Sequence, residues 1–202
     1  MSTGFIILAG GLGERFHGKK QDWVFHGKPL WKHVYDKTLA VADKENIVVV
    51  GKDVPGGKTR SMSVINGLKK LDSEMEKVLI VEAARPLVTK QQLLELIEDN
   101  SKSSSFVMPL VNTPIGRDGT YYDRKKMYDL LVPQAFDYNM LLKAYDTGKY
   151  LDMTDETRVM YEEYGIKPHL IETGQNLFKV TYPRDVAVLE SIYLSMSETK
   201  KD

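Results

Sequence analysis

Short apolar runs alternate with amphipathic stretches along the first half of the chain. Runs of strand length, bounded by polar or glycine-rich segments, predict buried strands at Phe5–Leu8, Ile47–Val50, Val78–Val81 and Phe106–Leu110. Apolar residues at helical spacing predict three intervening helices, which begin at Pro29, span about Ser61–Leu71 and follow the capping box Thr89-x-x-Gln92. Strand–helix–strand repetition predicts an α/β fold with a doubly wound, mostly parallel sheet that is covered on both faces.

The pattern changes after the fourth apolar run. Residues 111–124 are polar and turn-rich, which predicts a short inserted arm or lid within a single domain over residues 1–202. Beyond the arm, the sequence predicts helices at Asp137–Thr147 and Thr154–Tyr164, a strand near Phe178–Thr181, a last helix from Pro183 and a frayed tail over Ser195–Asp202.

Charge and composition exclude several classes of function. The 202 residues include 28 Lys and Arg and 28 Asp and Glu, so the formal net charge is zero. A neutral chain lacks the excess positive charge of a general nucleic-acid or anionic-membrane binder, and we expect neither partner. The absence of cysteine excludes disulfides, thiolate catalysis and cysteine-ligated zinc. With no signal-like start and no apolar segment of membrane-spanning length, we expect a soluble cytoplasmic protein.

The first strand runs directly into a glycine-rich turn, Ala9-Gly10-Gly11-Leu12-Gly13. Glycine N–H groups can wrap a phosphate, and Arg15 and Lys20 then offer cations to the same anion. Because open α/β sheets bind ligands at the carboxyl ends of their strands, this segment predicts a nucleotide site. A glycine-rich turn with solvated basic neighbours explains the same residues equally well at this point.

A second glycine-rich turn follows the second strand and ends in Gly57-Lys58-Thr59. It invites comparison with a P-loop, which has four residues between its first glycine and the Gly-Lys pair. Here Gly51 and Gly57 enclose five residues, and the loop would not close in the same way around a phosphate. A P-loop NTPase or kinase is therefore a weaker alternative.

Charged residues follow several of the predicted strands. They are Arg15 and Lys20 after the first, Arg60 after the second, Glu82 and Arg85 after the third, and Lys179 within the last. In a doubly wound sheet these strand ends lie along one edge, so the side chains can converge there. Several cations with one or two carboxylates suit a triphosphate with Mg²⁺, which prefers oxygen ligands and substrate phosphates.

An ordered set of short motifs covers nearly the whole chain: Leu8-Ala9-Gly10-Gly11-x-Gly13-x-Arg15, Lys20-Gln21, Gly56-Gly57, Arg60-Ser61-x-Ser63-Val64, Glu82-Ala83-Ala84-Arg85-Pro86, Pro133-Gln134-x-Phe136, Thr154-Asp155-Glu156 and Lys179-Val180-Thr181. In order and spacing this set resembles the methylerythritol phosphate cytidylyltransferase family and the related ribitol phosphate cytidylyltransferases. The resemblance implies a Rossmann-like domain, a homodimer, and transfer of a cytidylyl group from CTP to a sugar-alcohol phosphate with release of pyrophosphate.

The resemblance also implies roles for individual residues. Arg15, Lys20 and Lys179 match the catalytic cations that bind the triphosphate and stabilise the transition state. Nucleotide contacts are implied for Ala9, Gly10, Gly11, Gly13, Gly57 and Ser63, and contacts near the ribose and the metal for Glu82 and Arg85, with Glu82 as the candidate Mg²⁺ ligand. In the arm, Thr113 and Arg124 match residues that grip the phosphate of the acceptor.

Departures from the family pattern leave the acceptor open. Glu82 stands where the family usually has aspartate, and the arm is shorter than usual. The expected acceptor resembles methylerythritol 4-phosphate, with ribitol phosphate or a phosphonate as alternatives. A nucleotide binder that has lost catalysis is a further alternative.

Overall fold

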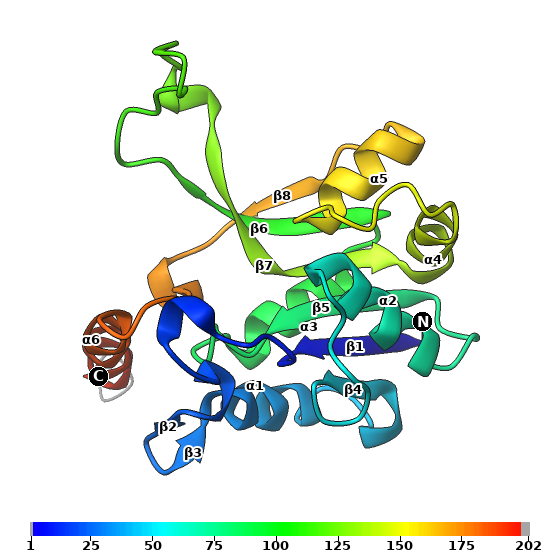
Figure 1. Ribbon diagram of the computed structural model, residues 1–202, viewed down its shortest axis with the longest axis horizontal. Helices are drawn as coiled ribbons and strands as arrows, with labels where there is room; N and C mark the ends of the chain where they lie inside the picture. Colours follow the sequence, from blue (N-terminus) through cyan, green and yellow to red (C-terminus); the bar gives the residue numbers. More distant parts are fainter. Residues whose placement is uncertain (1, 199–202) are drawn as a thin grey trace.

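The structure, a computed structural model, describes residues 2–198 and is built on one six-stranded sheet (Figure 1). The strands are β1 (Thr3–Leu8), β4 (Ile47–Val50), β5 (Lys77–Glu82), β6 (Ser103–Pro109), β7 (Tyr128–Asp137) and β8 (His169–Glu172). Their order across the sheet is β4-β1-β5-β7-β6-β8. Only β7 runs against its neighbours among these six strands. The prediction of a mostly parallel sheet is confirmed.

Helices cover both faces of this sheet. They are α1 (Leu30–Leu39), α2 (Arg60–Lys70), α3 (Lys90–Glu98), α4 (Tyr138–Asp146) and α5 (Glu156–Tyr164), while α6 (Asp185–Glu198) packs outside the sheet. Alternate residues of the central strands point to opposite faces. In β1, Ile6 packs in the core formed with α2, α4 and α5, whereas Phe5 and Ile7 pack in the core formed with α1 and α3. The doubly wound arrangement is therefore confirmed by the packing as well as by the strand order.

A smaller apolar cluster lies outside the sheet. The hairpin of β2 (Val24–Phe25) and β3 (Lys28–Pro29) contributes Phe25, and α6 contributes Leu189. Val180 joins them, and its N–H donates to the carbonyl of Ala84 at 2.9 Å. This cluster fixes the chain around Lys179 against the carboxyl end of β5. The remaining short helical turns are 3-10 segments at Glu14–Phe16, Lys20–Asp22, Lys44–Asn46, Arg124–Lys126 and Gln175–Leu177.

The predicted strand near Phe178–Thr181 is wrong, and strands β7 and β8 are not among the predictions. Residues 178–181 form no strand, because their apolar side chains pack in the cluster beside α6 instead of joining the sheet. Strand β7 was not predicted, because Pro133 interrupts its apolar run and proline disfavours strands. Pro133 lies where the pairing of β6 with β7 shifts register, between the pairs Ser105–Gln134 and Phe106–Leu131, so its missing N–H removes no bond of the ladder.

The predicted helices are found with small shifts at their ends. Thr89 and Gln92 form the expected capping box at the start of α3, and Gly165 ends α5 in the left-handed conformation with φ 68°. The last helix begins at Asp185 and continues to Glu198, so residues 195–198 are helical and not frayed, while 199–202 lie outside the described residues. The segment expected to form an arm connects β6 with β7 and extends away from the rest of the chain at the top of Figure 1.

Candidate functional site

A cleft of about 720 Å³ opens at the carboxyl ends of β1 and β5. Its lining comprises the first glycine-rich turn from Leu8 to Phe16, Lys20, Gln21, the second turn from Gly56 to Arg60, Ser63, Glu82, Ala83, Ala84, Lys179 and Thr181. Ten of the predicted nucleotide-binding and catalytic residues line this cleft: Ala9, Gly10, Gly11, Gly13, Arg15, Lys20, Gly57, Ser63, Glu82 and Lys179. The sheet topology therefore brings together residues from the two ends of the sequence.

The first glycine-rich turn has a conformation that its glycines make possible. Gly13 has φ +70°, and a Cβ there would lie 1.8 Å from the carbonyl oxygen of Gly18. The Gln21 amide donates to the carbonyl of Gly11 at 3.0 Å and ties the turn to the next segment. Nothing within 4 Å would meet a Cβ on Gly11, so that position faces open space. The backbone of the turn is thus fixed by protein contacts while part of it faces the cleft.

Arg15 and Lys20 bring positive charge to the lining of the cleft. Within residues 2–198, neither side chain forms an ion pair with a carboxylate. The Arg15 guanidinium carbon lies 5.9 Å from the centre of the Tyr182 ring. Burial lowers the pKa of Lys20, and the neighbouring positive charges of Lys179 and Arg15 lower it further. These cations are therefore arranged to receive an anion.

Glu82 places a single negative charge among three cations. Its carboxylate lies 2.9 and 2.8 Å from Lys179 Nζ, 3.2 Å from Arg85 Nε and 3.5 Å from Arg60 Nε. Burial by itself would raise the pKa of Glu82, but the charges of Lys179, Arg85 and Arg60 outweigh it and lower the pKa to about 2. Glu82 is therefore ionised at neutral pH, and it holds Lys179 at the edge of the cleft.

Arg85 supports Glu82 from outside the cleft. Its side chain is buried, and Nη1 donates to the carbonyl of Leu177. Arg85 is not among the residues that line the cleft, so a direct contact with the ribose would require it to move. In this structure its contact with the site is the ion pair with Glu82.

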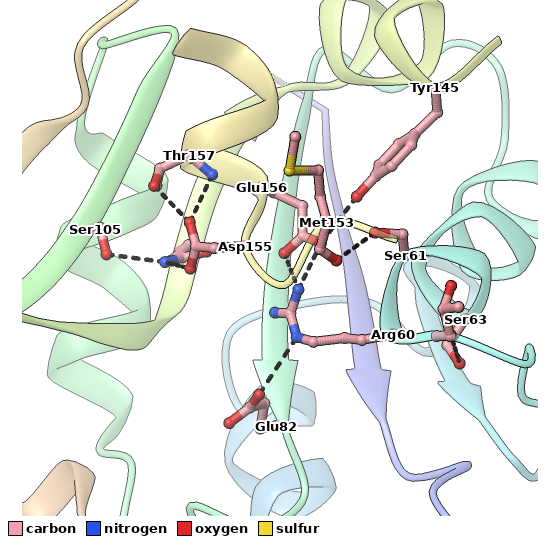
Figure 2. A network of polar contacts seen from close by, with 12 residues as sticks. Arg60, Ser61, Ser63, Glu82, Ser105, Tyr145, Met153, Asp155, Glu156 and Thr157 are labelled. Atoms are coloured by element: carbon pink, nitrogen blue, oxygen red, sulfur yellow. Dashed lines mark hydrogen bonds and ion pairs between the residues drawn. The ribbon is translucent and has the colours of Figure 1, made fainter. Parts of the chain in front are cut away.

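Arg60 connects Glu82 to a second, deeply buried carboxylate (Figure 2). Nη1 of Arg60 lies 2.6 and 2.5 Å from the two carboxylate oxygens of Glu156, the first residue of α5. The Tyr145 hydroxyl donates to the same carboxylate at 2.9 Å. Sequence reasoning placed Arg60 at this edge of the sheet but missed the contribution of Glu156, whose motif Thr154-Asp155-Glu156 was the available signal.

Ser63 and Gly57 form a polar pair in the lining of the cleft. The Gly57 N–H donates to Ser63 Oγ at 3.0 Å, and the Ser63 hydroxyl donates to the carbonyl of Thr59 at 3.1 Å. The only proton of this hydroxyl is therefore already engaged, and Ser63 Oγ presents a lone pair to a ligand. The N–H groups of Gly51, Lys52, Asp53 and Gly57 all donate within the protein, so the second glycine-rich turn does not present the row of amides that a P-loop offers.

The two predicted acceptor-binding residues lie elsewhere. Thr113 and Arg124 are exposed in the segment between β6 and β7, and neither lines the cleft. Arg124 Nη1 donates to the carbonyl of Val111 within the same segment. In the part of the chain that the structure describes, no three His, Asp or Glu side chains converge as a metal site, and no helix is long and apolar enough to cross a membrane.

Comparison with known proteins identifies relatives over nearly the whole chain. Residues 52–195 match the family model described as IspD, 2-C-methyl-D-erythritol 4-phosphate cytidylyltransferase. A protein of that name from Clostridium botulinum (strain 657 / Type Ba4) is 35% identical, with 93% of this chain and 95% of that protein aligned. Another of the same name from Haemophilus influenzae (strain PittGG) is 29% identical, with 96% of each covered.

Solved structures show the same architecture. The bifunctional IspDF from Campylobacter jejuni superposes with a TM-score of 0.82 at 27% identity. The match covers 94% of this chain but only 55% of the bifunctional chain. The 4-diphosphocytidyl-2C-methyl-D-erythritol synthase from Anaerococcus prevotii superposes with a TM-score of 0.80 at 21% identity, over 96% of each chain, and shows the shared fold. With the family model and the Clostridium botulinum relative in agreement, the chain belongs to the 2-C-methyl-D-erythritol 4-phosphate cytidylyltransferase (IspD) family.

Proposed function

We propose that this protein is a cytidylyltransferase that joins CTP to methylerythritol 4-phosphate, giving a CDP-alcohol and pyrophosphate. Family membership supports the reaction and the two substrates. The observation that carries the proposal to this chain is the cleft itself. Arg15, Lys20, Glu82 and Lys179 line the same space, together with two glycine-rich turns.

The reaction needs positioning and charge neutralisation more than proton transfer. The second pKa of a phosphate monoester is about 6, so the acceptor phosphate is largely a dianion at neutral pH and attacks without a general base. One of its oxygens forms a bond to the α-phosphorus of CTP, and the bond from that phosphorus to the departing pyrophosphate oxygen breaks. Both reactants are anions, and we assign Arg15, Lys20 and Lys179 to hold them together and to stabilise the charge that develops.

Cytosine selection is assigned to the Ser63 end of the cleft. Cytosine carries an exocyclic amino group, a donor, where uracil carries an oxygen, an acceptor. Since the Ser63 proton is engaged by the Thr59 carbonyl, Ser63 Oγ can accept from the cytosine amino group but would face the uracil oxygen lone pair to lone pair. With Ala9, Gly10 and Gly57 as close backbone neighbours, this polarity favours CTP over UTP.

Mg²⁺ is proposed as the metal, with Glu82 as its protein ligand. The residues fit in one respect: Glu82 remains ionised, and Mg²⁺ commonly combines one carboxylate with substrate phosphates and water. Both Glu82 oxygens contact Lys179, so a metal could reach them only after that lysine has turned toward the nucleotide. When bound, Mg²⁺ would neutralise charge on the triphosphate.

The arm is proposed to act through a partner subunit. The resemblance assigns Thr113 and Arg124 to the acceptor phosphate, yet neither lines the cleft of its own chain. A homodimer in which the arm of one protomer reaches the cleft of the other would reconcile the implied role of these residues with their position. The arm exposes Val111 and Tyr121 by 77% and 76%, an exposure typical of contact surfaces. A cytoplasmic location remains part of the proposal.

The test is pyrophosphate release with Mg²⁺, offering CTP, UTP, ATP and GTP against methylerythritol 4-phosphate, ribitol phosphate and aminoethylphosphonate. We expect release with CTP and methylerythritol 4-phosphate, and a product of the mass of the CDP-alcohol. Release with CTP and another acceptor would keep the chemistry and correct the substrate. CTP-dependent thermal stabilisation without any release would indicate a nucleotide binder and contradict the proposal.

A further inference from the structure

Glu156 is a buried carboxylate that the reaction scheme does not use. Its side chain is 0% exposed and does not line the cleft. Such a group is costly to bury unless it is paired, and here it receives Arg60 Nη1 on both oxygens and the Tyr145 hydroxyl on one. Burial by itself would lower the pKa of Arg60, but the charges of Glu156 and Glu82 outweigh it and raise the pKa, which keeps Arg60 charged.

Arg60 divides its donors between two carboxylates that belong to different elements. Nη1 is committed to Glu156, while Nε lies 3.5 Å from Glu82 Oε1 at the carboxyl end of β5 (Figure 2). The neighbouring Ser61 donates to the carbonyl of Met153 at 2.6 Å, which fastens the start of α2 to the segment before α5. The guanidinium therefore cannot follow a ligand without losing its short contact with Glu156.

Arg85 is fixed in the same way. Its Nη1 is bound to the carbonyl of Leu177, and its Nε contacts Glu82. Arg60 and Arg85 thus each have a second partner besides Glu82. Within residues 2–198, the contacts of Lys179 Nζ are with Glu82 alone. The Lys179 side chain is also 35% exposed, against 22% for Arg60 and 9% for Arg85.

We propose that Glu156 is a positioning residue, which fixes Arg60 so that Arg60 and Arg85 neutralise Glu82 and leave Lys179 available to the nucleotide. The inference rests on the proposed function. Without the negative charge of Glu156, Arg60 would lose the contact that fixes Nη1 and could turn into the cleft that it lines, away from Glu82. Glu82 would then hold Lys179 more strongly, and Lys179 would contribute less to the triphosphate.

A double-mutant cycle measured by CTP binding tests this mechanism without relying on turnover. The charge is removed by Glu156→Gln, which keeps the shape of the side chain, and its effect is measured in wild-type protein and in the Lys179→Met background by titration calorimetry. We expect Glu156→Gln to weaken CTP binding about tenfold in the wild-type background, a coupling typical of a charged network. In the Lys179→Met background we expect less than about a twofold effect, because the residue through which Glu156 acts is gone.

Two further variants separate positioning from loss of structure. Tyr145→Phe disturbs the same buried carboxylate but leaves its ion pair with Arg60, and we expect CTP affinity within about twofold of wild type. Glu156→Asp keeps the charge on a shorter side chain, and we expect an intermediate loss; it serves in the cycle if Glu156→Gln fails to fold.

An equal loss of affinity in both backgrounds, or no loss in the wild-type background, would overturn the proposal. A wild-type chain that does not bind CTP would instead overturn the proposed function.

Discussion

Two groups of cations at the site, here called the unpaired side and the paired side, hold their charges differently. Arg15 and Lys20 have no carboxylate partner within residues 2–198, whereas Lys179, Arg60 and Arg85 share Glu82. In the absence of a ligand, the unpaired side lowers the stability of the fold. The lowered pKa of Lys20 indicates this, because burial and the neighbouring positive charges disfavour its charged form. The paired side is held in position before the ligand arrives. We propose that the unpaired side attracts an anion, whereas the paired side is preorganised to hold it.

The largest expected effect is on catalysis, from removal of a cation on either side. Lys20→Ala and Lys179→Ala should each lower kcat/KM by about 10²–10³, as loss of a preorganised charge-stabilising group does elsewhere. The measurement is pyrophosphate release from CTP and methylerythritol 4-phosphate. Lys69→Ala, a change at the end of α2 outside the cleft, is the matched control and should keep wild-type activity. Wild-type rates for Lys20→Ala would contradict the assignment of that side to catalysis.

The next effect concerns the acid stability of the paired side. Because the pKa of Glu82 in the fold is about 2, below its ordinary value of 4.5, its contribution to the free energy of unfolding is complete above about pH 5. That contribution, about 3 kcal/mol, is lost as the pH falls toward 2. The difference in urea-unfolding free energy between wild type and Glu82→Gln should therefore shrink from pH 6 to pH 3. A difference that is constant with pH would show that the carboxylate charge is not what stabilises this side.

A smaller effect distinguishes two glycines of the turn that carries the unpaired cations. Gly13→Ala should lower the free energy of unfolding by about 2 kcal/mol, because alanine is strained at φ +70° and its Cβ would strike the Gly18 carbonyl. Gly11→Ala meets no neighbour within 4 Å and should leave stability within about 0.5 kcal/mol of wild type. Its methyl group would instead weaken CTP binding. Thermal unfolding and calorimetry compare the two, and equal destabilisation would refute this distinction.

The sequence predicted the unpaired side more completely than the paired side. Arg15 and Lys20 follow a buried strand and a glycine-rich turn within 20 residues, so local pattern alone brings them together. The partners of Glu82 come from positions as far as 97 residues away, and Glu156 lies 96 residues from Arg60. A local sequence pattern predicts that a charged residue at the first position of a helix, such as Glu156, is exposed. Only tertiary packing buries it.

The strand errors have the same origin. Strands β4 and β5 were predicted because each is buried along its whole length and reads as a continuous apolar run. Strand β8, at the edge, is largely exposed and gives no such signal. The apolar run at 178–181 gives the signal but packs beside α6. The sequence therefore indicates that an apolar run is buried, but not whether the run is buried as a strand of the sheet or in a cluster beside a helix.

Thermal unfolding of wild type, Lys20→Ala and Lys179→Ala, each with and without CTP, tests the division between the two sides most directly. Without ligand, Lys20→Ala should unfold at or above the wild-type temperature, because it removes a cation repelled by Lys179 and Arg15. Lys179→Ala should unfold about 3 °C lower, because it removes a partner of the buried Glu82. CTP should stabilise wild type more than either variant. Equal lowering in both variants without ligand, or equal stabilisation of all three by CTP, would contradict the account.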